Sequence, residues 1–128
     1  MTYENTIRSL TAKQCRECHG PKSPSLADFK KDKKGYEEKD LGPRMDTYDT
    51  LMIFVNGPDT GALMRRLDDG THTKDGKPGN MYKNLGDHPT ERAANLAIFK
   101  SWVGGWTLKQ SAQISPTERQ AIRAPRSL

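Results

Sequence analysis

The residues best suited to chemistry lie close together near the amino terminus, in the sequence Cys15-Arg16-Glu17-Cys18-His19. Two cysteines three positions apart at the end of a helix present both thiols on one side, where they can form thioethers with the two vinyl groups of haem. The histidine that follows directly places an imidazole beneath the iron. The pattern therefore predicts one covalently attached haem c, with Cys15 and Cys18 as its anchors and His19 as the proximal iron ligand.

Two other uses of a Cys-x-x-Cys pair fit the sequence less well. A thiol redox pair opens a helix that follows a strand, whereas this pair comes at the end of a predicted helix with no strand before it. A structural zinc site needs four nitrogen or sulfur ligands. It would have to recruit His72 and His88 from segments without zinc-finger spacing.

Hydrophobic spacing predicts helices around this motif and no strands. Apolar residues recur with helical period in four segments, namely residues 3–14, 47–55, 59–67 and 90–102. Thr47 and Thr90 are expected N-caps, and Gly57 and Gly104 are expected to end their helices. The predicted fold is all-α with long loops, because the lysine-rich stretch 20–44 and residues 68–80 are rich in glycine or proline.

Composition predicts a thin core that needs a partner or a cofactor. Hydrophobic residues make up 33% of the 128 residues, and the longest wholly apolar run is Leu51–Val55. A run of this length is too short to span a bilayer, so no transmembrane segment is expected. The net charge of +5 suits an acidic protein partner. Nucleic-acid binding is not expected, because aromatic residues are few and no basic stripe is interleaved with them.

The order of these features resembles class I cytochrome c over residues 3–104. An amphipathic helix ending in Cys-x-x-Cys-His-Gly is followed by a middle helix, a methionine after a glycine-rich loop, and a carboxyl-terminal helix. The resemblance implies a cytochrome c-like fold in which Ile7 and Leu10 meet Leu96 and Phe99. It also implies that a loop methionine is the distal iron ligand. Met81 precedes Leu96 by 15 residues and has the best spacing for that role.

The resemblance further implies a hydrogen bond that orients the proximal histidine. Gly42-Pro43-Arg44-Met45 resembles the family segment whose proline carbonyl accepts the imidazole Nδ1–H. The stretch from His19 to Pro43 is longer than in compact members, so Pro24 competes with Pro43. Such a bond sets the ring tautomer and strengthens the iron-bound nitrogen as a donor.

Other residues compete with Met81 for the distal position. Met64 and His72 are the alternatives. The segment that ends in Met64 could serve as a loop that presents an iron ligand, and His72 lies in a loop that could reach the iron. Met45 is expected beside Pro43, and Met52 is expected in the core.

With histidine and methionine on iron, the resemblance implies an electron carrier and not an enzyme. Single electrons would pass between redox partners by outer-sphere transfer through the haem edge. The alternative is a gas-binding or weakly peroxidatic haem c protein with an open distal site. The exposed lysines expected to meet an acidic docking surface are Lys30, Lys31, Lys33 and Lys34.

Two expectations concern location and chain organisation. Haem c is attached outside the cytoplasm in bacteria, so the protein is expected in the periplasm, its signal peptide having been removed. Residues 1–106 are expected to form the haem domain. Residues 107–128 are expected to form a polar extension, either a strap anchored by Ile114, Ile122 and Leu128 or a flexible end.

Overall fold

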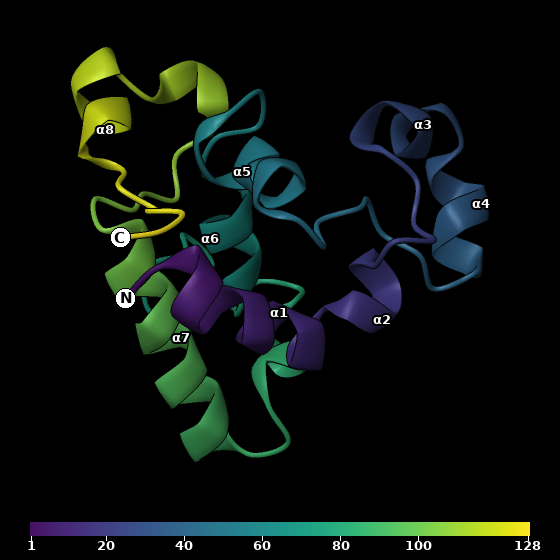
Figure 1. Cartoon of the computed structure of the whole chain (residues 1–128), viewed down its shortest axis with the longest axis horizontal. Helices are drawn as coiled ribbons and strands as arrows, with labels where there is room; N and C mark the ends of the chain where they lie inside the picture. The colour runs from purple at the N-terminus through teal and green to yellow at the C-terminus, as the bar shows by residue number, and fades with distance from the viewer.

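The computed structural model describes residues 1–128 and is built from helices joined by long connections (Figure 1). It contains no β-sheet, and its single β-bridge pairs Gly104 with Ile122. The all-α prediction is therefore confirmed. The α-helices are α1 (Arg8–Gln14), α2 (Arg16–His19), α3 (Leu26–Lys31), α4 (Lys33–Glu38), α5 (Tyr48–Asn56), α6 (Ala62–Leu67), α7 (Pro89–Val103) and α8 (Pro116–Ala121). The shorter turns are the π-helical η1 (Tyr3–Ile7) and the 3-10 helices η2 (Tyr82–Leu85) and η3 (Ser111–Gln113). No helix combines the length and apolar composition that crossing a membrane would need.

The core takes in residues of η1, α5, α6 and α7, and η1 and α1 run close to α7 in Figure 1. Ile7 and Phe99 are completely buried, Leu96 is nearly so, and Leu10 packs against the same cluster. Full burial of a side chain such as Phe99 contributes roughly 1.5–3 kcal/mol. This contact holds the helix that leads into Cys15 against the longest helix of the molecule.

The structure changes two details of α7. The N-cap is His88, whose Nδ1 accepts a hydrogen bond from the Glu91 amide at 3.2 Å, with Pro89 in the first helical turn. Thr90 was therefore wrongly predicted as the cap. The second detail is the buried face: helical spacing predicts an apolar face that includes Ala93 and Ala97, but both residues are exposed. Their positions lie outside the stripe that faces the core, which consists of Leu96, Phe99, Trp102 and Val103.

Residues 20–44, predicted to be a loop, contain a helical hairpin made of α3 and α4. It stands at the right of Figure 1, joined to the rest by extended segments. Ser25 and Asp32 cap the two helices, and the rings of Phe29 and Tyr36 stack with centroids 6.2 Å apart. Neither helix has a buried residue. The apolar period is therefore too weak to predict these helices, and local capping defines them.

The carboxyl-terminal residues form a strap across the core instead of a flexible end. Carbonyls of the strap accept hydrogen bonds from the Tyr3 amide (Pro125 O, 2.8 Å) and the Tyr48 hydroxyl (Ala124 O, 2.8 Å). Ile114 and Ile122 are buried as expected. Leu128 is fully exposed, so its predicted role as an anchor was wrong. The strap joins the two ends of the chain and closes the core.

Candidate functional site

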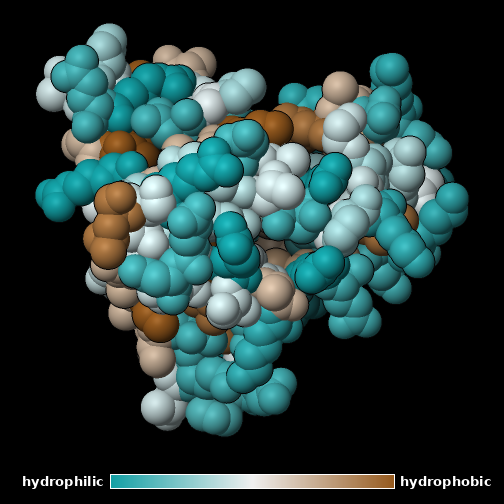
Figure 2. Space-filling model, viewed as in Figure 1, coloured by the Kyte–Doolittle hydropathy of each residue, from teal (hydrophilic) through white to brown (hydrophobic).

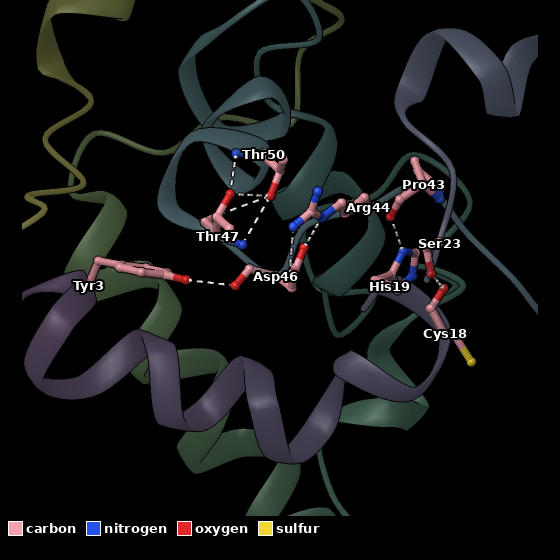
Figure 3. Close-up of polar contacts among 9 residues, drawn as sticks. All are labelled: Tyr3, Cys18, His19, Ser23, Pro43, Arg44, Asp46, Thr47 and Thr50. Atoms are coloured by element: carbon pink, nitrogen blue, oxygen red, sulfur yellow. Dashed lines mark hydrogen bonds and ion pairs between the residues drawn. The ribbon is translucent and has the colours of Figure 1, made fainter. Parts of the chain in front are cut away.

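His19 is the best-defined side chain of the candidate site. It ends α2 and is only 9% exposed, and its Nδ1 lies 2.7 Å from the carbonyl oxygen of Pro43 (Figure 3). The carbonyl can only accept, so Nδ1 carries the proton and Nε2 keeps its lone pair. The alternative residue, Pro24, has its carbonyl engaged by the Arg44 amide at 2.7 Å. The chain therefore brings Pro43, and not Pro24, to the imidazole.

Electrostatics favour the neutral form of this imidazole. Burial lowers the pKa of His19, the hydrogen bond to Pro43 acts in the opposite direction, and the positive charge of Arg66 lowers it further. A lowered histidine pKa means that less acid-base work is needed to free the ring nitrogen for a metal. The side chain is thus prepared to act as a ligand.

A short segment from Gly42 to Met45 runs along α2 and clamps the ring. The Gly42 amide donates to Cys18 O at 2.8 Å, and the Met45 amide donates to His19 O at 3.0 Å. A Cβ atom at position 42 would overlap the imidazole itself. Glycine is required there because the backbone approaches the ring so closely.

We expect Gly42→Ala to displace this clamp. The added methyl group must push either the segment or the imidazole away, at a cost of about 1–3 kcal/mol. Lengthening the Nδ1–Pro43 bond would also weaken the ring nitrogen as a donor and raise the reduction potential of the haem protein. Urea unfolding and redox titration of the holoprotein measure both effects. Leu41→Ala, a neighbouring substitution that removes atoms, should leave the potential unchanged. A Gly42→Ala protein with the stability and potential of the parent would contradict the clamp.

The two cysteines are free, and each is half-buried. Burial raises the pKa of Cys15 to about 11 and also raises that of Cys18, where the charges of Glu17 and Asp40 add to the effect. Redox-active and zinc-binding cysteines need the opposite shift, toward the thiolate. Burial of the pair therefore does not favour a redox-active thiolate.

A cavity of about 130 Å³ lies between α1 and the segment that follows Pro43. It is lined by Arg8, Thr11, Ala12, Cys15, Arg16, His19, Met45 and Asp46. The cavity brings one predicted anchor together with the predicted proximal ligand, and it places Met45 beside Pro43 as expected. Free thiols, a neutral imidazole with an available Nε2, and a glycine that admits no side chain are the features that a covalently bound haem requires. The residues present fit the group.

The ion pair of Arg44 and Asp46, of which Asp46 lines this cavity, was not predicted from the sequence. Figure 3 shows Arg44 directed at Asp46, whose backbone carbonyl also accepts from the Tyr3 hydroxyl at 3.3 Å. The hydrogen bond from Arg44 holds the pKa of Asp46 below its usual value. Arg44 directly follows Pro43 and Asp46 comes two residues later, but a pair two residues apart in an irregular segment has no periodic signal that would reveal it.

The residues considered for the distal position lie apart from this cavity. Met81 precedes η2 and is half-buried; its amide donates to Arg66 O at 2.9 Å, and its sulfur lies 3.7 Å from Asn84 Nδ2. Met64 is 2% exposed and packs within the core, and Met52 also packs against the core. His72 is half-exposed, with Nδ1 3.2 Å from a carboxylate oxygen of Asp68. The distal role of Met81 stays a prediction.

Comparison with known proteins gives two matches and one negative result. The family model described as PccH cytochrome c matches residues 2–122. Among solved structures, the chain is similar to the monohaem cytochrome PccH from Geobacter sulfurreducens, with 47% identity, 97% of each chain covered and a TM-score of 0.90. No curated protein gives a significant match.

The extent of the match is informative, because it includes the parts that depart from compact class I cytochromes. The helical hairpin of residues 26–38 and most of the strap lie within the matched range. These parts therefore belong to the family's own architecture. A monohaem cytochrome c carries one covalent haem c, and Cys15 and Cys18 fit the Cys-x-x-Cys-His motif for its attachment. The chain belongs to the PccH cytochrome c family and is a monohaem c-type cytochrome.

Proposed function

We propose that the protein carries single electrons by outer-sphere transfer through an exposed haem edge, with His19 and Met81 as axial ligands. The observation that carries this proposal is the buried His19 ring, neutral and held by Pro43 with Nε2 available. Haem c supplies a one-electron iron couple when bound. A methionine opposite the histidine would fill the last coordination position and leave none for a substrate.

The chain's own residues contribute rigidity and electrostatics to this function. The Nδ1–H bond to Pro43 keeps the proximal ring in one orientation in both redox states. The close fit of Gly42 against the imidazole restricts its rotation. Small changes in ligand geometry between the two states favour rapid electron exchange.

One observation favours a second candidate, a gas-binding or weakly peroxidatic protein with an open distal site. The Met81 sulfur contacts Asn84, and Met81 is absent from the lining of the cavity beside His19. An absorption spectrum of the purified holoprotein separates the two functions. A low-spin spectrum with a sulfur-to-iron charge-transfer band supports electron transfer. A high-spin spectrum that changes when CO is added to the reduced protein supports gas binding and overturns the first proposal.

The helical hairpin is the proposed docking surface for an acidic redox partner. Lys30 and Lys31 end α3, Lys33 and Lys34 begin α4, and all four are exposed. Of these, Lys31 alone has an acidic partner, Asp28 at 3.8 Å, and both side chains of that pair are solvent-exposed. Figure 2 shows a largely hydrophilic surface over this part of the molecule. The hairpin also carries Asp28, Asp32, Glu37 and Glu38, so the proposal rests on the four lysines being grouped where α3 meets α4 on a projecting element. Such a local group of positive charges is suited to steering an acidic protein.

Replacing these four lysines by glutamine should slow association on the order of tenfold at low salt and flatten its dependence on ionic strength. Stopped-flow oxidation of an acidic flavodoxin, used as a probe, measures the rate. The double variant Lys33→Gln/Lys34→Gln should associate with the probe more slowly than the double variant Lys74→Gln/Lys77→Gln. The second variant is the control, because it removes the same charge from another exposed loop. Equal rates for the two double variants would show that the hairpin lysines do not steer the partner and are ordinary solvated surface residues.

We further propose a periplasmic location. The support is the covalent haem, whose attachment takes place outside the cytoplasm in bacteria. Osmotic-shock fractionation of the native host, followed by haem staining, tests the location. Haem-stained protein confined to the cytoplasmic fraction would overturn it.

A further inference from the structure

Asp68 is a buried carboxylate that the haem site described above does not use. It directly follows α6 and is completely buried. One carboxylate oxygen accepts from the amides of Gly70 (2.9 Å) and His72 (3.3 Å), and the other lies 3.2 Å from His72 Nδ1. Hydrogen bonds to a charged acceptor are roughly twice as strong as neutral ones. Through these hydrogen bonds, the Asp68 side chain fixes the first part of the loop that leads to Met81.

The far end of the same loop is pinned to the end of α6. The Gly79 amide donates to the carbonyl of Asp68 at 2.9 Å, and the Met81 amide donates to the carbonyl of Arg66 at 2.9 Å. A Cβ atom on Gly79 would collide with the Arg66 backbone, so the two segments are in direct contact. The loop thus begins and ends on the last turn of α6.

Contacts inside the loop connect its two ends. The Thr73 hydroxyl donates to Lys77 O at 2.8 Å, and Gly70, with φ of +93°, lies against the backbone of Gly76 and Lys77. On its outer side, the His72 ring meets Trp106 edge-on with centroids 5.0 Å apart. A displacement near Asp68 would therefore reach Gly79 and Met81.

We propose that Asp68 is a positioning residue for Met81. Its side chain holds the turn after α6 in one conformation, and the carbonyl of that turn anchors Gly79, two residues before the proposed ligand. The inference rests on the proposed function, because it requires Met81 to bind the iron. It adds the residue that keeps the loop in the form that presents this ligand.

The test compares the parent holoprotein with Asp68→Asn and Asp69→Asn. The first substitution keeps the size of the side chain but removes the charge that binds two amides and the His72 ring. Asp69 is exposed and bonds only within its own turn, to the Thr71 amide, so it is the matched control. We expect Asp68→Asn to lose at least half of the sulfur-to-iron band and to bind CO at least tenfold faster when reduced. Asp69→Asn should match the parent within twofold.

A global loss of stability must be separated from a local one. Met64→Ala creates a cavity in the core on the same helix and serves as the comparison, because it should lower the melting temperature without releasing Met81. Hydrogen exchange of the Gly79 and Met81 amides should quicken at least tenfold in Asp68→Asn beyond any change in Met64→Ala. Equal band loss in Met64→Ala and Asp68→Asn would overturn the proposal.

The remaining outcomes distinguish this inference from the function on which it rests. A parent that lacks the sulfur-to-iron band overturns the ligation by Met81, and the inference with it. A parent that shows the band, together with an Asp68→Asn protein that keeps the band and the parent's CO rate, overturns the inference alone.

Discussion

Replacing both Cys15 and Cys18 by alanine is expected to yield a protein that lacks covalent haem and has lost its cooperative thermal unfolding. The reason lies in where the core is. Its sixteen buried residues include Tyr3 and Ile7, but none lies between residue 8 and residue 50. That stretch contains the haem-binding motif, the hairpin and the Pro43 segment, and its apolar side chains that pack against the core are only partly buried.

The bound group should supply the apolar surface that this stretch lacks. Removal of apolar surface from water is the main driving force of folding, and a ligand held only by the folded state stabilises that state. Haem staining and circular-dichroism melting measure the two losses. The single variants Cys15→Ala and Cys18→Ala are the controls, because each keeps one thioether and should retain part of the stability. A double variant with a cooperative melt close to that of the parent would contradict a fold that depends on haem.

Replacing Met81 by alanine is expected to open the distal iron position. The sulfur-to-iron band should disappear, and CO or cyanide should bind readily. The reduction potential should fall on the order of 0.1 V, a fraction of the range of about 0.8 V over which axial ligands set haem potentials. It should fall because a thioether sulfur favours the ferrous state. Absorption spectra, ligand titration and redox potentiometry measure these effects.

Met64→Ala is the matched control for the loss of a methionine. Met64 is buried in the core, so its truncation should cost about 2–5 kcal/mol of folding free energy. It should leave the band and the potential unchanged. Loss of the band in Met64→Ala with retention in Met81→Ala would reverse the assignment. If the parent itself lacks the sulfur-to-iron band, an open distal position or ligation of the iron by His72 would be favoured.

Much of the molecule could be predicted from sequence because the relevant signals are local. Cysteine and histidine spacing in Cys15-x-x-Cys18-His19 needs one turn of helix and no partner. Thr47 caps α5 through hydrogen bonds within three residues, so its role is encoded next to it. Helical period likewise marked Ile7, Leu96 and Phe99 as buried, although they lie far apart in the chain.

Local signals also explain two of the errors. The choice of Thr90 over His88 as the cap overlooked Pro89, since proline favours the first position of a helix. The helices α3 and α4 carry good caps, but they bury no residue. A prediction that depends on an apolar stripe therefore passes over them.

Residue types and their spacing were enough to predict the haem-binding motif and the all-α fold class. They were also enough to predict the core residues through which the amino-terminal helical segment packs against α7. Two contacts could be seen only in the folded chain: the strap binds the amino terminus through Pro125, and Asp68 binds the loop before Met81. The folded chain also decides between Pro43 and Pro24 as the partner of His19, in favour of Pro43. These contacts use backbone carbonyls and amides, which nearly every residue carries, so no residue type announces them. Their partners are set by how the chain turns in space, and that follows from packing of the whole core.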